Sequence, residues 1–314
     1  MRLEQCRALL TGASGGIGQE MVERLCAGGA RLLLVGRGSL ALQALARRHP
    51  DEVSLVCADL TQHSGRLAVL EAARRFGGIN CVINAAGVNQ FSLLEQQDED
   101  AIARLIGVNV TATLQLTHLL LPLLREQPRA LLVNLGSTFG SIGYPGFATY
   151  CASKFALRGF SEALRRELAD THIKVLYVAP RATRTAMNSV EVVAMNDALK
   201  VSMDDPQAVA AQIVQAIMAE RAQAALGAGP GAEYDAMPDA QLGRPRFAGD
   251  GAVGCRGELG EGGLALRGRQ LIVDLGPARL QLMQRFVAGR GEREGGLAGQ
   301  SQQNGTQAEQ ALHG

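Results

Sequence analysis

The stretch LLTGASGGIGQEMVERL, residues 9–25, joins a short apolar run to an amphipathic run through a turn rich in glycine. The turn contains Gly12, Gly16 and Gly18, which let a chain bend tightly and let backbone N–H groups approach a bound phosphate. A helix that begins near Ile17 directs its positive end at that turn. The stretch therefore predicts a strand, a phosphate-binding turn and a helix. The expected binding residues of the turn are Gly12, Ser14, Gly16, Ile17 and Gly18.

The spacing of these glycines is G-x-x-x-G-x-G, which differs from the usual G-x-G-x-x-G fingerprint of dinucleotide-binding proteins. A purely structural turn between a strand and a helix is the alternative interpretation. Its place on the first strand–helix connection of the chain favours binding, because ligands of such folds sit at that connection.

Outward from this stretch, short apolar runs alternate with amphipathic runs along most of the chain. The apolar runs are continuous, which is typical of strands buried on both faces. The predicted strands cover 7–12, 30–36, 53–60, 80–87, 129–137 and 173–180. The predicted helices cover 17–27, 39–48, 64–76, 98–126, 150–170 and 204–221, the last with an Asp N-cap and Pro206 in its first turn. This alternation predicts an α/β fold, a doubly wound Rossmann-type parallel sheet flanked by helices.

Length and composition fit one large α/β domain, alone or with an appendage: 314 residues, of which 47% are hydrophobic. A net charge of +1 gives no electrostatic basis for binding nucleic acid or an acidic membrane. The six cysteines form no CxxC pair and the five histidines are scattered, so we expect free thiols in a reducing compartment and no metal site.

The start of the chain and its longest apolar stretch bear on localisation. Residues 1–20 lack the pattern of a signal peptide. The longest apolar stretch is interrupted by His118, Pro122 and Arg125, so we expect no uninterrupted membrane span. The expected location is the cytoplasm.

The second predicted strand ends in VGRGS, where a domain that selects NAD usually places a carboxylate for the ribose 2′-hydroxyl. Gly36 and Arg37 stand there instead. A guanidinium can pair with a 2′-phosphate, which predicts that NADP(H) is preferred over NAD(H), although an ordinary surface arginine is the alternative. Asp59 and Leu60, which end the third strand, are expected beside the adenine, with a helix N-cap as the other role for Asp59.

Tyr150 and Lys154, in ATYCASKFALRG, are four positions apart on a predicted helix and so share one face. A phenol has a pKa of about 10, and a neighbouring ammonium is expected to lower the pKa of Tyr150 by favouring the phenolate. The pair can then transfer a proton to or from a carbonyl oxygen. Ser137 ends the fifth predicted strand, at the sheet edge where ligands bind in this class of fold.

In their order and spacing, TGASGGIG (11–18), NAAG (84–87), Asn109, Ser137 and YCASK (150–154) resemble the short-chain dehydrogenase/reductase family. The resemblance covers about residues 5–221 and implies an NAD(P)-dependent oxidoreductase that acts on a carbonyl or alcohol. It implies a catalytic tetrad of Asn109, Ser137, Tyr150 and Lys154, in which the Asn helps to hold a water that links the Lys to solvent.

The resemblance also implies further cofactor contacts. Lys154 would bond the nicotinamide ribose, and the NAAG motif would line the adenine and ribose side. Arg181 stands where the family usually has glycine, which puts the local backbone path in question. The cofactor-binding residues implied beyond the turn are Asn84, Ala85, Gly87, Tyr150, Lys154, Pro180 and Thr185.

The segment 183–203 and the aromatic residues before Tyr150 are mostly apolar, which favours an apolar ketone, aldehyde or acyl-derived substrate. Core packing of the same residues is the alternative. Reduction is the direction that the family leads us to expect, with assembly as a homodimer or homotetramer through the long helices. A catalytically silent NADP(H)-binding sensor or scaffold is the rival interpretation of function.

The composition changes at about residue 225, and 20 of the 38 glycines lie in 225–314. Such a segment buries too little apolar area to offset chain entropy, so we expect a poorly ordered, Gly-rich, low-complexity tail. Two origins stay open: a natural tail, or a frameshift near 222–230 in a GC-rich bacterial gene. The predicted domains are therefore 1–224, which binds NADP(H), and the tail 225–314.

Overall fold

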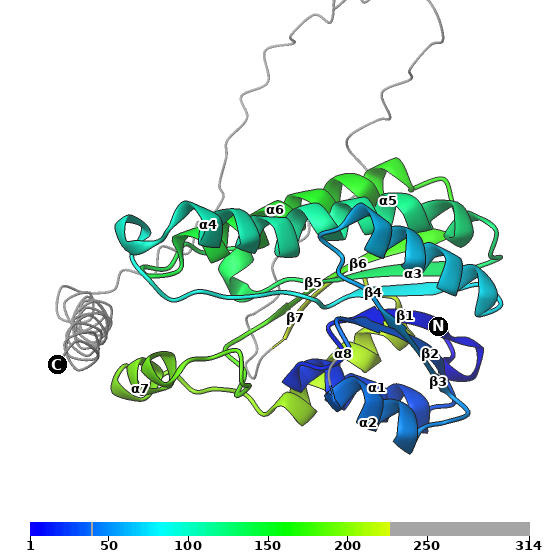
Figure 1. Cartoon of the computed structure of the whole chain (residues 1–314), viewed down its shortest axis with the longest axis horizontal. Coiled ribbons are helices and arrows are strands. Elements are labelled where there is room, and N and C mark those ends of the chain that lie inside the picture. Colours follow the sequence, from blue (N-terminus) through cyan, green and yellow to red (C-terminus); the bar gives the residue numbers. More distant parts are fainter. Residues whose placement is uncertain (39, 227–314) are drawn as a thin grey trace, which may run out of the picture.

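The computed structural model describes residues 1–38 and 40–226, and within them one parallel sheet is covered by helices on both faces (Figure 1). The order of its strands is β3-β2-β1-β4-β5-β6-β7, and every described pairing is parallel. The strands are β1 Arg7–Thr11, β2 Arg31–Gly36, β3 Val53–Cys57, β4 Cys81–Asn84, β5 Ala130–Leu135, β6 Ile173–Pro180 and β7 Gln223–Leu226. The predicted Rossmann-type fold is confirmed.

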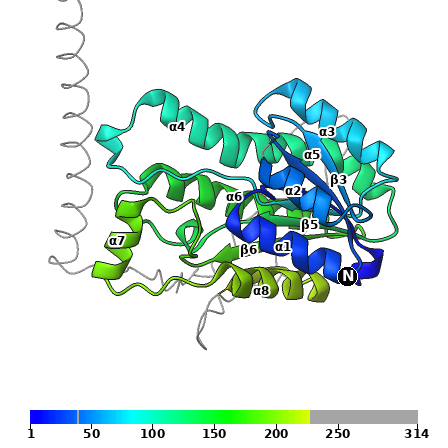
Figure 2. The ribbon, with the colours of Figure 1, turned by 60° about the horizontal axis from the view of Figure 1, so that its bottom comes forward.

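The helices form two layers, one on each face of the sheet (Figures 1 and 2). The α-helices are α1 Gly16–Ala27, α2 Leu40–Arg48, α3 His63–Arg75, α4 Glu99–Ile106, α5 Ala112–Arg125, α6 Ala148–Glu167, α7 Val190–Ala198 and α8 Pro206–Ala219. Side chains of α1, α2 and α8 form one hydrophobic core with one face of the strands, and side chains of α3, α5 and α6 form a second core with the other face.

The strand order reverses between β1 and β4, which are neighbours in the sheet although 69 residues separate Thr11 from Cys81. The crevice at the carboxyl ends of these two strands is the place where open α/β sheets bind ligands. The fold thereby brings the turn after β1, the segment after β4 and the segment after β5 to one edge of the sheet.

Two elements differ from the prediction. The sheet has a seventh strand: β7 pairs with β6 from Tyr177↔Gln223 to Pro180↔Leu226 and so extends past the predicted boundary at 224. The single helix predicted over 98–126 consists of α4, a π-helical segment Gly107–Thr111, and α5. The rest of the predicted tail, from residue 227, lies outside the described residues.

The helical run Glu99–Arg125 is the one described segment long and apolar enough to cross a membrane by length and composition. Leu116, Leu120 and Leu124 on this run are fully buried in the core that α3 and α6 share with the sheet. The core helix of a globular α/β protein has these same properties, so the run is explained by the fold.

Candidate active site

The turn between β1 and α1 needs glycine at three positions for steric reasons. Gly12 has a φ of +73°, and a Cβ there would lie 2.6 Å from the carbonyl carbon of Ala85. A Cβ on Gly18 would collide with the Gly12 carbonyl oxygen, and one on Gly16 would lie 2.9 Å from Thr185 Cγ2. Glycine at these positions therefore allows the close packing of the turn against its neighbours, and the turn lies before the α1 N-terminus, where backbone N–H groups favour an anion. This cradle fits the pyrophosphate of a dinucleotide.

The end of β1 is fixed to the segment after β4 through one hydroxyl. Thr11 Oγ1 accepts hydrogen bonds from the N–H groups of Ala85, at 3.1 Å, and Ala86, at 3.0 Å. The turn and the start of the NAAG segment are therefore held together as one wall.

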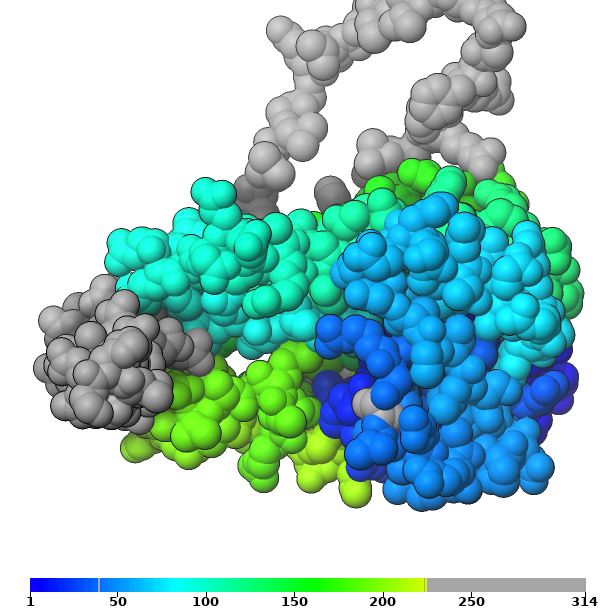
Figure 3. Space-filling model, viewed as in Figure 1, coloured from blue at the N-terminus to red at the C-terminus, as the bar shows by residue number. Residues whose placement is uncertain are grey.

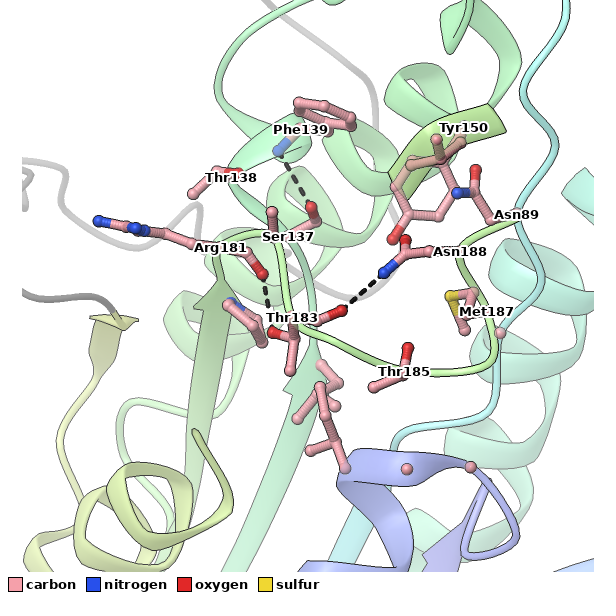
Figure 4. Close-up of a pocket in the computed structure, with 18 of the residues that line it drawn as sticks. Asn89, Ser137, Thr138, Phe139, Tyr150, Arg181, Thr183, Thr185, Met187 and Asn188 are labelled. Atoms are coloured by element: carbon pink, nitrogen blue, oxygen red, sulfur yellow. Dashed lines mark hydrogen bonds between the residues drawn. The ribbon is translucent and has the colours of Figure 1, made fainter. Parts of the chain in front are cut away.

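A cavity of about 600 Å³ opens at this edge of the sheet, a size typical of sites for small molecules and cofactors (Figure 4). The space-filling view shows a hollow between the layer that contains α4 and the segment that carries α7 (Figure 3). The predicted site residues that line the cavity are Gly12, Ser14, Gly16, Ile17, Gly18, Ala85, Gly87, Ser137, Tyr150, Lys154, Pro180 and Thr185.

Tyr150 and Lys154 both project from α6 into this cavity. Lys154 Nζ lies 5.5 Å from the centre of the Tyr150 ring and donates a hydrogen bond to the Leu135 carbonyl at 3.0 Å. Ser137 caps the short 3-10 helix Thr138–Gly140, with its Oγ accepting from Phe139 N–H, rather than lying at the end of β5 as predicted.

The pKa shifts of the pair are set by burial. Burial raises the pKa of Tyr150 above 10.0, and a hydrogen bond with Ser137 opposes that rise. Burial lowers the pKa of Lys154 to about 8. The expectation that Lys154 lowers the pKa of Tyr150 is therefore wrong for this arrangement, because burial dominates the shift and Ser137, rather than Lys154, is the group that opposes it. A neutral phenol beside a hydroxyl is a proton donor ready for a carbonyl oxygen.

Asn109 lies in the π-helical segment and is fully buried. Its Nδ2 donates to the Val88 carbonyl at 2.9 Å and to Ser153 Oγ at 3.0 Å, and its Oδ1 accepts from Val88 N–H at 2.8 Å. Ser153 Oγ in turn donates to the Tyr150 carbonyl at 2.7 Å. Asn109 therefore ties the segment after β4 to the helix that carries Tyr150.

Asn84 lies away from the cavity, in the core. Its Nδ2 donates to Asn134 Oδ1 at 2.9 Å and to Thr117 Oγ1 at 3.2 Å, and Asn134 donates to Ser161 Oγ at 2.8 Å. This polar network joins β4, β5, α5 and α6. The structure therefore places Asn84 under the site rather than in its lining.

Three other predicted residues also lie outside the lining of the cavity. Arg37 follows β2 and is exposed, while Asp59 and Leu60 follow β3 at the same edge of the sheet. Asp59 Oδ1 accepts from the N–H of Thr61 at 2.9 Å and from its hydroxyl at 2.7 Å. These bonds lower the pKa of Asp59, with a smaller contribution from Arg37. Asp59 is thus engaged in a local turn.

The other end of the cavity is apolar and aromatic. The rings of Phe139 and Tyr144 stack at 4.9 Å, and Phe147 lies 5.1 Å from Phe139. These rings line the cavity and also pack on α7. Cys151, next to Tyr150 on α6, is also buried.

The segment after β6 runs along the cavity and turns back into α8. Arg181, at the position where glycine was expected, needs no positive φ. Its guanidinium pairs with Asp204 at 3.5 Å and donates to the Ser202 carbonyl at 3.4 Å. A short parallel bridge, Thr183↔Asp204, closes the excursion that carries α7. The departure from glycine therefore leaves the chain path intact.

Three asparagines in the lining, Asn89, Asn188 and Asn196, were not predicted from the sequence. Asn89 follows the NAAG segment and lies beside the Tyr150 ring, and Asn188 donates from Nδ2 to the Thr183 carbonyl at 2.7 Å (Figure 4). Asn89 stands only two positions after Gly87, the last residue of the motif. That proximity was the available signal for its place in the site.

Comparisons with known proteins match this arrangement. Residues 7–196 match the family described as short chain dehydrogenase. An uncharacterized oxidoreductase of Staphylococcus saprophyticus is 34% identical over 183 residues, which are 57% of this chain and 74% of that protein. The 3-oxoacyl-(acyl-carrier-protein) reductase of Vibrio cholerae is 30% identical over 188 residues, which are 60% of this chain and 77% of that protein.

One solved structure extends the likeness to the fold. The 3-ketoacyl-(acyl-carrier-protein) reductase from Brucella melitensis, complexed with NADH, superposes with a TM-score of 0.65 at 26% identity. The match covers 71% of this chain and 96% of that one.

Proposed function

The chain belongs to the short-chain dehydrogenase family, and we propose that it reduces an apolar ketone, aldehyde or acyl-derived carbonyl compound with NADPH. As a member of this family it is an NAD(P)-dependent oxidoreductase that acts on CH–OH or C=O groups. The observation that carries the proposal is the meeting of Ser137, Tyr150 and Lys154 in one cavity with the glycine turn.

In the proposed mechanism, the nicotinamide cofactor supplies the hydride when bound. The Ser137 hydroxyl holds the substrate oxygen, and the neutral Tyr150 phenol donates its proton to that oxygen. Lys154 stabilises the phenolate left behind, because an ammonium favours a nearby negative charge. Asn109 completes the tetrad as a positioning residue, since it holds both the Tyr150 helix and the segment after β4.

Residues around the turn would hold the cofactor. Gly12, Gly16 and Gly18 line the cavity at the α1 N-terminus and would hold the pyrophosphate there. Lys154 would bind the ribose hydroxyls, and Pro180 and Thr185 would flank the nicotinamide, as the lining of the cavity supports.

The preference for NADP(H) rests on Arg37. This side chain is exposed directly after β2, and Gly36 leaves that strand end without the carboxylate that selects NAD. The exposed guanidinium is free of any described ion pair, so it can pair with a 2′-phosphate.

The apolar end of the cavity supports an apolar substrate. Phe139, Tyr144 and Phe147 form one wall, and Met187 and Met195 come from the segment around α7. Methionine side chains adapt to ligands of varied shape. The relatives named as 3-oxoacyl and 3-ketoacyl reductases favour an acyl-derived carbonyl within this class.

We also propose assembly as a homodimer or homotetramer through α4, α5 and α6. The exposed Phe155 on α6, with 44% of its surface accessible, supports a contact on that helix. The five described cysteines are free, which supports a reducing cytoplasmic location.

The test is a panel of apolar ketones, aldehydes and keto esters, assayed with NADPH and with NADH by nicotinamide absorbance. We expect turnover of at least one class, with a higher kcat/KM for NADPH. Arg37→Ser should raise the KM for NADPH about 10-fold or more and leave the KM for NADH unchanged, because it removes a charge-assisted pair.

Two results would overturn these proposals separately. Absence of turnover across the panel, with both cofactors bound, would remove the assigned reaction. A higher kcat/KM with NADH in the wild type, unaltered by Arg37→Ser, would remove the NADP(H) preference and leave the reaction standing.

A further inference from the structure

Asn89 is a half-buried side chain that lines the cavity beside the ring of Tyr150 (Figure 4). It enters from the segment after β4, on the opposite side of the cavity from Arg181. The proposed mechanism uses Ser137, Tyr150 and Lys154, and it gives Asn89 no task.

The amide of Asn89 forms no hydrogen bond with any described residue. Its Oδ1 is shielded from solvent and has no partner, which costs roughly 1–3 kcal/mol. Its Nδ2 also has no described partner, but it is not shielded, and Figure 4 shows it turned toward Tyr150. A leucine of similar size would avoid this cost, so stability does not explain the asparagine.

The position of Asn89 is nevertheless tightly held. The N–H and the carbonyl of the preceding residue, Val88, are both bonded to Asn109, at 2.8 and 2.9 Å. The same Asn109 amide reaches Ser153, which bonds the Tyr150 carbonyl. The buried amide of Asn109 therefore fixes Asn89 relative to the proton donor, as specific recognition of a substrate requires.

We propose that Asn89 is a specificity-determining residue whose Nδ2–H donates a hydrogen bond to a second oxygen of the substrate. Because Asn89 adjoins Tyr150, which meets the reacting carbonyl, this second oxygen lies within a few atoms of the reacting carbon. The substrate class is then a carbonyl compound with a nearby acceptor oxygen, as in keto esters and keto thioesters, with an apolar remainder against the aromatic wall. This inference rests on the proposed function.

The experiment compares ethyl acetoacetate with methyl pentyl ketone, which has the same chain length but lacks the second carbonyl. We expect the wild type to prefer ethyl acetoacetate in kcat/KM, and Asn89→Leu to reduce that preference about 10-fold by lowering only the ester value. The melting temperature of Asn89→Leu should equal or exceed that of the wild type, because the variant removes an unpaired buried carbonyl.

Asn188→Leu is the matched control, because it removes an amide from the same cavity. That amide already donates to the Thr183 carbonyl, so the variant should lower the melting temperature and leave the preference between the two substrates unchanged. Asn89→Ala provides a second variant if the leucine perturbs the fold.

Two results would overturn the proposal: no wild-type preference for the ester, or an equal loss of both activities in Asn89→Leu. If the wild type reduces neither compound, the proposed function fails at that step. Calorimetric titration with both compounds in the presence of NADPH then decides the role of Asn89 alone. Tighter binding of ethyl acetoacetate by the wild type than by Asn89→Leu would support the proposal, and equal affinity of the two proteins for this ester would contradict it.

Discussion

Lys154 in the candidate active site and Glu220 at the end of α8 are both buried charges, but the protein surrounds them differently. The Glu220 carboxylate, 4% exposed, pairs with the Met1 ammonium at 2.9 Å, Arg129 Nε at 2.6 Å and Lys174 Nζ at 2.8 Å. The Lys154 ammonium has only a neutral partner among the described residues, the carbonyl of Leu135.

The pKa values record this difference. Burial raises the pKa of Glu220, but Lys174, Arg129 and the N-terminal ammonium outweigh it and bring the pKa to about 2. Burial alone lowers the pKa of Lys154 to about 8. A buried charge that is offset by opposite charges holds elements together. A buried charge without an opposite charge loses its proton more easily, and such perturbed groups are typical of reactive sites. The comparison separates the structural part of this molecule from its reactive part.

The largest expected effect is that of Tyr150→Phe, which should greatly reduce catalytic activity without changing the stability of the protein. Removing the phenolic O–H removes the proton donor, so kcat should fall about 1,000-fold. The melting temperature and the affinity for NADPH, measured by nicotinamide fluorescence, should stay unchanged. A variant that keeps more than a tenth of the wild-type kcat would show that the proton comes from another group.

Glu220→Gln should have the opposite profile, with a loss of stability and no loss of chemistry. Three cations would then surround a neutral amide, and we expect about 2 kcal/mol less unfolding free energy in urea, with kcat per folded molecule unchanged. This loss of unfolding free energy is smaller than for a fully buried ion pair, because Arg129 and Lys174 are themselves exposed.

Glu23 is the matched control for that prediction. It pairs with Arg48 at 2.6 Å and His49 at 2.8 Å, but it is 39% exposed. Glu23→Gln should cost less than about 1 kcal/mol, since exposed pairs contribute little. Equal losses in the two variants would remove burial as the reason for the importance of Glu220.

The last expected effects are two rises of stability with increasing pH, in two separate pH windows. The pKa of Glu220 is lowered from 4.5 to about 2, so its contribution is complete above pH 4.5 and is lost as the pH falls toward 2. The pKa of Lys154 is lowered from 10.5 to about 8, so the unfolded chain holds more protons and stability rises as the pH increases from 8 to 10.5.

Unfolding free energies of the cofactor-free protein, measured across both pH windows, check the two predicted changes. Glu220→Gln should flatten the acid slope only, and Lys154→Met should flatten the alkaline rise only. A Lys154→Met profile that still rises between pH 8 and 10.5 would assign that slope to a different group.

The fold could be predicted because its signals are local. Apolar runs buried on both faces and the glycine turn at 12–18 identify strands and their connection without knowledge of the rest of the chain. Strand β7 was missed because Gln223–Leu226 has only four residues and no distinct apolar run. Its pairing with β6 comes from the position that α8 gives it, which is a tertiary effect.

The candidate site was predictable where a helix or a strand end fixed the geometry. Tyr150 and Lys154 share a helix face by spacing, and Ser137 joins them because the carboxyl ends of parallel strands meet at one edge. The raised pKa of Tyr150 was not predictable from the pair, since burial depends on the whole fold. Asn89 was missed because its direction is set by Asn109, twenty positions further along the chain.

Helix α1 packs its buried face, with Met21, Val22 and Leu25, against α8, and the two lie side by side (Figure 2). Residues 28–205 separate them in the chain. At ribosomal speeds of about 5–20 residues per second, α1 waits roughly 10 to 40 s for its partner to be made. During that interval the apolar face of the cofactor-cradling unit is open to chaperones and to neighbouring nascent chains. The order of synthesis thus leaves this face of α1 without its partner until α8 has been made.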